Sequence, residues 1–337
     1  MFARRRLWFA WMSAWLAAAS VIGGAAPSTQ PAPRPGKSTA TWPLLPQAEF
    51  EASYTALATR SGLKIPADYP RKKREQWLSE TGVSDPTYEV YVPRSAGPGG
   101  KYGLLVWISP GPNGGAPRED WLAALNRHKL IWVGPNHVGN EVDGLLRAYM
   151  SLDAVRNAKQ QFPIDDARVF VAGMSGGGRL ASRAAVVAAD TFTGGGMFVC
   201  GCDFYRDVPE VANDIHGRYY KGFWPKPDPK LLKLAKQHRY VLVTGTEDMN
   251  RLNTHSVHDG FLKATFAHVT LFEVPGMGHT VPDGAWFEKA LTFLDSPDAT
   301  PATTKPGATT KPSTTTKPST RPSRGVIRVG PEQRPVR

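Results

Sequence analysis

Long apolar runs separated by helix-length segments dominate the middle of the chain. The first run alternates over Tyr88–Pro93, and uninterrupted apolar runs follow at Tyr102–Ser109, Lys129–Asn136, Arg168–Gly173, Gly195–Cys202, Arg239–Gly245 and His268–Gly276. Strands that are apolar on both sides are typical of a parallel sheet covered by helices on both faces. The pattern therefore predicts the strands of a mostly parallel sheet.

The segments between these runs have helical periodicity. Apolar residues share one face of segments 119–129 and 145–162, and an apolar segment over residues 284–295 follows the last strand. Alternation of strand and helix predicts the α/β class, with one doubly wound sheet in a single domain. In such sheets the functional sites gather beyond the carboxyl ends of the strands, so residues directly after strands are the candidates for chemistry.

Both ends of the chain depart from this pattern. Three arginines precede an apolar run over residues 7–22, which is the order of a secretory signal peptide over residues 1–25. An uncleaved membrane anchor is the alternative. Residues 26–45 and 298–337 are rich in proline and small polar residues, so we expect a linker and a disordered tail around a domain over residues 46–297. We expect a secreted or periplasmic protein.

The net charge of +12 is concentrated in these ends. Thirteen of the 41 lysines and arginines lie outside residues 42–297, but only two of the 29 acidic residues do. The remaining 28 basic and 27 acidic residues make the expected domain nearly neutral, which argues against a basic groove for nucleic acid. The basic ends are candidates for adhesion to anionic wall polymer or membrane surfaces, or are plain solubilising linkers. We expect a monomer.

The chain has two cysteines, Cys200 and Cys202, at the end of an expected strand. We expect buried thiols there, with a strained ring between them as the alternative. Two thiols alone do not make a zinc site, so we expect no metal.

A single serine stands among glycines where a strand meets a helix. The stretch GMSGG at residues 173–177 follows a strand-like run and precedes a helix-compatible segment. It matches G-x-S-x-G, in which the glycines permit a sharp, strained turn and the helix N-terminus favours negative charge. The pattern predicts that Ser175 is a nucleophile. The alternative is a phosphate-binding loop, but the lysine of a P-loop is lacking.

A serine hydroxyl needs a general base, and His279 is the best placed of eight histidines. It follows the last expected strand and precedes the last expected helix. His255 and His258 can share a helix face, but no third metal ligand is apparent, so we expect surface or supporting roles. His137 follows a strand and is a candidate substrate contact. The other four are expected to be structural: His128, His216, His238 and His268.

The histidine in turn needs a carboxylate to set its tautomer. Asp248 follows the penultimate strand and is the predicted acid. Glu247 is the neighbouring rival, and Asp203, beyond the preceding strand, is a more distant one. The predicted triad is therefore Ser175, Asp248 and His279.

An oxyanion hole requires two N–H donors. The Gly176 backbone is the expected first donor. The second is expected from the loop after Tyr102–Ser109, where Pro110 and Pro112 have no N–H. Gly111 is our choice, with Asn113 or a following glycine as alternatives.

These motifs resemble the α/β-hydrolase superfamily, in particular exported polyhydroxybutyrate depolymerases and feruloyl or acetylxylan-type esterases. The resemblance covers about residues 88–295 and is most specific in FPIDDARVFVAGMSGGGRLASRAA. VTGTEDMNR and GMGH match the segments that carry the acid and the histidine in that group. Ser-Pro-Gly-Pro at residues 109–112 replaces the usual His-Gly, and the loop cysteines of many relatives are absent. The resemblance implies ester hydrolysis through a serine acyl-enzyme, with no cofactor.

The segment 206–230 is rich in aromatic residues and proline. It is a candidate lid or substrate platform formed by Tyr219, Tyr220, Phe223 and Trp224, with Trp224 and His137 as expected substrate contacts. A plain surface excursion is the alternative. The predicted function is an exported serine hydrolase that acts on small or polymeric carboxylic esters. The alternatives are a serine peptidase on the same fold and a non-catalytic protein that binds wall material or carbohydrate.

Overall fold

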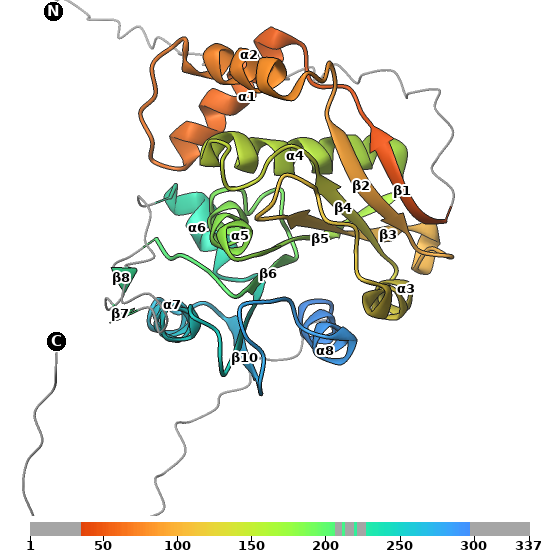
Figure 1. Ribbon diagram of the computed structural model, residues 1–337, viewed down its shortest axis with the longest axis vertical. Coiled ribbons are helices and arrows are strands. Elements are labelled where there is room, and N and C mark those ends of the chain that lie inside the picture. The colour runs from red at the N-terminus through yellow and green to blue at the C-terminus, as the bar shows by residue number, and fades with distance from the viewer. Residues whose placement is uncertain (1–34, 206–210, 213–218, 221–226, 297–337) are drawn as a thin grey trace, which may run out of the picture. The chain divides into compact units, whose positions relative to one another are not determined.

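An eight-stranded sheet forms the centre of the protein in the computed structural model, which describes residues 35–205, 211–212, 219–220 and 227–296 (Figure 1). Within this sheet, β1 with β2 and β2 with β4 are antiparallel, and the other pairs are parallel. In spatial order the strands are β1 Gly36–Thr41, β2 Thr87–Val92, β4 Leu130–Pro135, β3 Tyr102–Ile108, β5 Ile164–Met174, β6 Gly195–Val199, β9 Arg239–Gly245 and β10 His268–Val274.

This topology confirms the predicted fold class. β4 lies between β2 and β3, so the chain reverses its direction of travel across the sheet and then continues outward from β3 to β10. That order, with its antiparallel second strand, is the α/β-hydrolase fold. The carboxyl ends of the parallel strands meet along one edge, where side chains far apart in sequence can converge.

Helices cover both faces of the sheet, as the continuous apolar strands predict. One face of the sheet packs against α4, α5 and α7, and the other face packs against α3 and α8. On the first face, α1 packs against α4, and α2 packs against α1. The helices are α1 Gln47–Arg60, α2 Tyr69–Thr81, α3 Leu122–His128, α4 Gly144–Gln161, α5 Gly176–Val187, α6 Pro229–Ala235, α7 Arg251–Lys263 and α8 Gly284–Leu294, with single 3₁₀ turns at Pro98–Gly100 and Glu119–Trp121.

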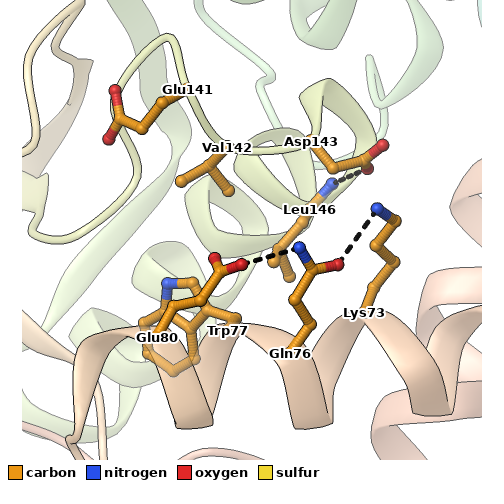
Figure 2. A pocket seen from close by; sticks show the side chains of 8 residues that line it. All are labelled: Lys73, Gln76, Trp77, Glu80, Glu141, Val142, Asp143 and Leu146. Carbon is orange, nitrogen blue, oxygen red and sulfur yellow. Dashed lines mark hydrogen bonds between the residues drawn. The ribbon is translucent and has the colours of Figure 1, made fainter.

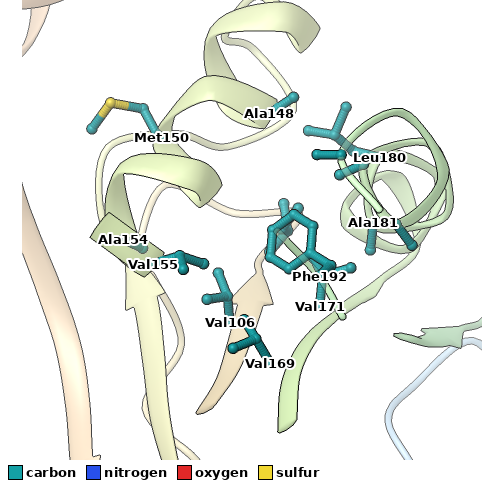
Figure 3. Packing of buried hydrophobic residues seen from close by; sticks show 14 of the residues in the cluster. Val106, Ala148, Met150, Ala154, Val155, Val169, Val171, Leu180, Ala181 and Phe192 are labelled. Atoms are coloured by element: carbon teal, nitrogen blue, oxygen red, sulfur yellow. The ribbon is translucent and has the colours of Figure 1, made fainter. Parts of the chain in front are cut away.

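Alternation along each central strand divides the interior into two cores. Leu104 and Val106 of β3 point to the face under α4 and α5, whereas Leu105 and Trp107 point to the face under α3 and α8. Figure 3 shows the first core, where side chains of α4 and α5 meet valines of the sheet around Phe192. Packing on both faces holds the strand ends rigidly, which positions the loops that follow them.

The segment expected to be a linker contributes a strand. Gly36–Thr41 pairs with β2 along its whole length, so the prediction of a linker over residues 26–45 is wrong for this part. Alternate residues of this edge strand are half-buried, which small side chains allow. The strand adds an edge to the sheet before the expected start of the domain.

Several predictions lie outside the described residues. They are the signal peptide over residues 1–25, the tail over residues 298–337 and the aromatic residues Phe223 and Trp224. In the aromatic segment 206–230, the two-residue strands β7 Val211–Ala212 and β8 Tyr219–Tyr220 pair with each other. Among the described residues, no helix has both the length and the apolar character needed to cross a membrane.

Candidate active site

Ser175 lies at the tight turn between β5 and α5. Its φ of 55° and ψ of −122° are strained for a residue with a side chain. The backbone is held on both sides, because the Ser175 N–H donates to the Val199 carbonyl at 2.8 Å and the Ser175 carbonyl accepts from the Arg179 N–H at 2.9 Å. The turn therefore projects the hydroxyl beyond the sheet edge, as the G-x-S-x-G motif predicts.

The glycines of the motif are required by close backbone contacts. A Cβ on Gly177 would lie 2.0 Å from the Ile108 carbonyl oxygen, and one on Gly173 would lie 2.6 Å from the Gly177 backbone. Both contacts are far shorter than any real carbon contact, so a side chain at either position would force the helix away from β3. The glycines thus allow α5 to begin directly against the strand ends.

His279 connects the serine hydroxyl to a buried carboxylate. Its Nε2 lies 2.9 Å from the Ser175 Oγ, and its Nδ1 lies 2.8 Å from the Asp248 Oδ1. An ionised carboxylate can only accept a hydrogen bond, so Nδ1 carries the proton of the neutral imidazole and Nε2 accepts from the hydroxyl. The structure therefore brings together the three residues that the sequence singled out, across 104 positions of the chain.

Asp248 is fully buried and its carboxylate is saturated with donors. Its Oδ2 accepts from the Thr244 hydroxyl at 2.7 Å, and its Oδ1 accepts from the Asn250 N–H at 3.1 Å as well as from His279. Burial alone raises its pKa, but these hydrogen bonds outweigh burial and hold the pKa of Asp248 below the ordinary value. The carboxylate is therefore ionised when the histidine works.

The two rival acids occupy other environments. Glu247 is exposed, and its N–H donates to the Met277 carbonyl. Asp203 is buried but is paired with Arg179 and Arg183 of α5. The residue that faces His279 is Asp248.

Cys200 is part of the same cluster, and the sequence did not indicate this. Its thiol lies 3.1 Å from the Thr280 carbonyl oxygen, in the loop that carries His279. Ligand atoms of Cys200, Asp248 and His279 lie within 4.8 Å of one another. Burial and the neighbouring Asp248 raise the pKa of the Cys200 thiol well above its usual range, so the thiol stays protonated and is a poor metal ligand. Cys200 and Cys202 are free and buried, as expected.

The predicted oxyanion donors differ in their surroundings. Gly176 begins α5, which places its N–H at the positive end of that helix. The Gly111 N–H, however, donates to the Ser109 Oγ at 3.1 Å. The Gly111 N–H, which was expected to face the substrate, is therefore used in a hydrogen bond inside the loop after β3.

His137 has a strained backbone that is fixed by the loop after β3 and by α2. Its φ is 60°, its N–H donates to the Pro112 carbonyl, and its carbonyl accepts from the Trp77 indole at 2.8 Å. Within the described part of the chain, no hydrogen bond connects its ring to Ser175 or His279. Its proposed contact with substrate therefore stays a prediction, and Trp224 lies outside the described residues.

Three further histidines have their partners outside this cluster. His255 of α7 pairs with Glu273, and His258 lies 3.8 Å from Asp259, so these two do not converge on one site. His128 bonds to Asp295.

A cavity of about 240 Å³ lies between α2 and the residues at the start of α4 (Figure 2). Its lining includes Lys73, Glu80 and Glu141 around the indole of Trp77. None of the residues that line it belongs to the Ser175 cluster. The cavity therefore offers no place for a group that reacts with Ser175.

Comparison with known proteins finds similarity at the level of structure only. No protein-family model and no curated protein matches the chain. An arylesterase structure matches 78% of this chain and 87% of its own length at 14% identity and a TM-score of 0.48. A poly(3-hydroxybutyrate) depolymerase from Bordetella parapertussis matches 64% and 86% at 18% identity and a TM-score of 0.46.

A thermostable esterase matches 64% of this chain at 17% identity and a TM-score of 0.41, and the chain spans only 60% of that esterase. A feruloyl esterase module is also among the similar structures. These neighbours are esterases and hydrolases, as the motifs of the sequence led us to expect.

Proposed function

We propose that this chain is an exported serine hydrolase that cleaves carboxylic esters. The observation that carries the proposal is the continuous series of short contacts from Ser175 Oγ through His279 to the buried Asp248. Such a series lets a weak nucleophile lose its proton as it attacks. Export is supported by the arginine-led apolar segment at the N-terminus.

In the acylation step, His279 Nε2 takes the proton of the Ser175 hydroxyl while Oγ attacks the ester carbonyl carbon. Negative charge then develops on the carbonyl oxygen, where the Gly176 N–H stabilises it. The carbon–oxygen bond to the alcohol breaks, and the protonated His279 gives its proton to the departing alcohol. Asp248 stabilises the imidazolium throughout.

In the deacylation step, water attacks the acyl-enzyme and His279 takes the proton of that water. The bond between Ser175 Oγ and the acyl carbon breaks, the proton returns to Oγ, and the carboxylic acid leaves.

The proposal is tested with a fluorophosphonate probe and an ester panel on the purified protein. We expect the probe to label the wild type and not Ser175→Ala, and the wild type to hydrolyse nitrophenyl acetate or butyrate. Peptide nitroanilides in the same panel distinguish a peptidase, and hydroxybutyrate and feruloyl esters define the acyl group. Absence of labelling together with absence of ester turnover would overturn the proposal.

A further inference from the structure

Two backbone donors of the loop after β3, the N–H groups of Gly111 and Gly114, are used within the protein. Pro110 and Pro112 have no N–H, and the Gly111 N–H donates to the Ser109 hydroxyl at 3.1 Å. The Gly114 N–H donates to the Asn136 side chain at 2.5 Å. Gly176 alone would leave the developing negative charge with one of the two donors that such sites normally provide.

The side chain of Asn140 lies directly against Gly176. From the position that a Cβ on Gly176 would occupy, the Asn140 Oδ1 is 2.2 Å away and the Nδ2 is 2.9 Å away. Bond geometry places the Gly176 nitrogen about 2.5 Å from that same position. The amide group of Asn140 is therefore a close neighbour of the first oxyanion donor, and Gly176 is a glycine because Asn140 occupies the space of a side chain.

The orientation of the Asn140 amide is set by Arg147. The Arg147 Nη1 donates to the Asn140 Oδ1 at 3.0 Å, and a guanidinium has no acceptor. The oxygen must therefore face Arg147, which leaves the two N–H bonds of Nδ2 for another acceptor. Asn140 is exposed, so that acceptor can belong to a bound substrate.

Arg147 also makes the support of this amide rigid. Its guanidinium is buried and donates to the backbone carbonyls of Ser109 and Val138 at 2.9 and 2.8 Å. The Asn140 N–H in turn donates to the Pro110 carbonyl at 2.9 Å. Burial lowers the pKa of Arg147 to about 10, which leaves it charged at neutral pH. One buried cation thus holds the loops after β3 and β4 together beside the nucleophile.

We propose that the Asn140 side chain is the second donor of the oxyanion hole, with Nδ2–H and the Gly176 N–H binding the carbonyl oxygen of the ester together. This inference rests on the proposed function and corrects the prediction that Gly111 supplies the second donor. Asn140 would be a catalytic residue, and Arg147 would be the positioning residue behind it.

The test uses Asn140→Ala and Asn140→Asp in the full protein. Asn140→Asp keeps the shape and the contact with Arg147 but replaces the donor by an acceptor. With nitrophenyl butyrate we expect kcat to fall about 10²–10³-fold in both variants, with KM within threefold of the wild type. Gln47→Ala, which removes an exposed amide from α1, is the control and should keep at least half of the wild-type kcat.

Two results would contradict this role. A loss of less than 30-fold in either variant would overturn the inference. Retained activity in Asn140→Asp with a large loss in Asn140→Ala would mean that Asn140 only supports the loop, and would overturn it as well. If Asn140→Ala does not fold, Asn140→Asp decides.

Ser109→Ala tests the rival donor, because it frees the Gly111 N–H. If kcat of Ser109→Ala rises threefold or more, the second oxyanion donor is the Gly111 N–H and not Asn140. Wild-type turnover and labelling of Ser175 are measured in the same series. If the wild type hydrolyses no ester, the proposed function fails. If the wild type hydrolyses esters and the Asn140 variants are equally active, the assignment of Asn140 to the oxyanion hole fails, but the proposed function stands.

Discussion

Replacement of Asp203 by alanine should destabilise the protein without removing its chemistry. The Asp203 carboxylate is buried and accepts from Arg179 Nη1 at 2.7 Å and from Arg183 Nε at 2.8 Å. Removal of one partner from a buried ion pair costs about 3–5 kcal/mol. Because the Arg183 side chain is 45% exposed and can be rehydrated, we expect the low end, about 3 kcal/mol. For a domain of this size that corresponds to a fall in Tm of about 6–12 °C.

The assay is thermal unfolding followed by circular dichroism, with kcat measured well below the Tm of the variant. Asp190→Ala is the matched control, because Asp190 pairs with Arg60 at 2.9 Å but both side chains are about 40% exposed. Such a surface pair contributes about 0–1 kcal/mol, so its Tm should fall by about 4 °C at most. A Tm of Asp203→Ala within 2 °C of the wild type, or a loss of kcat above 100-fold, would refute this reasoning.

Three further results are expected from contacts elsewhere in the protein. Asp248→Asn should lower kcat by about 10⁴-fold with little change in Tm, since the tautomer of the histidine is no longer set. Cys200 and Cys202 should resist iodoacetamide at pH 8 while the protein is folded, because burial raises the pKa of both thiols, and mass spectrometry should find two adducts after unfolding. Burial alone raises the pKa of Asp295, but hydrogen bonds from His128 and Arg168 hold it below the ordinary value of about 3.9. The stability that this ionised group contributes is present above pH 5 and is lost as the pH falls through the folded-state pKa, so the stability deficit of Asp295→Asn should shrink below pH 4 in urea titrations.

Much of the sheet could be predicted because its signals are local. Continuous apolar runs such as Tyr102–Ser109 are buried on both faces, and their helix-length separation predicts parallel pairing. The edge strand Gly36–Thr41 has no such signal, since its residues are small or polar and half of them face solvent. Only its pairing with β2 makes it a strand.

The candidate site likewise combines residues that the sequence could predict with contacts that depend on tertiary packing. A residue at the carboxyl end of a parallel strand must lie at the edge where sites form, so Ser175, Asp248 and His279 could be singled out from their positions alone. The choice between Glu247 and Asp248 depended on which of two adjacent side chains the turn after β9 directs inward. The contact between Asn140 and Gly176 joins residues that no motif connects.

The amino-acid sequence alone indicated the class of the fold, the position of Ser175 at a strained turn, and the order of Ser175, Asp248 and His279 along the chain. These depend on periodicity and on glycine, whose effects act within a few positions along the chain. The packing of the folded chain sets which side chains lie within 3 Å of one another, how Arg147 orients Asn140 and how Asp203 holds α5 through Arg179. Such contacts depend on how separate strands and loops pack against each other. A local sequence pattern carries no information about the distance between side chains from segments far apart in the chain.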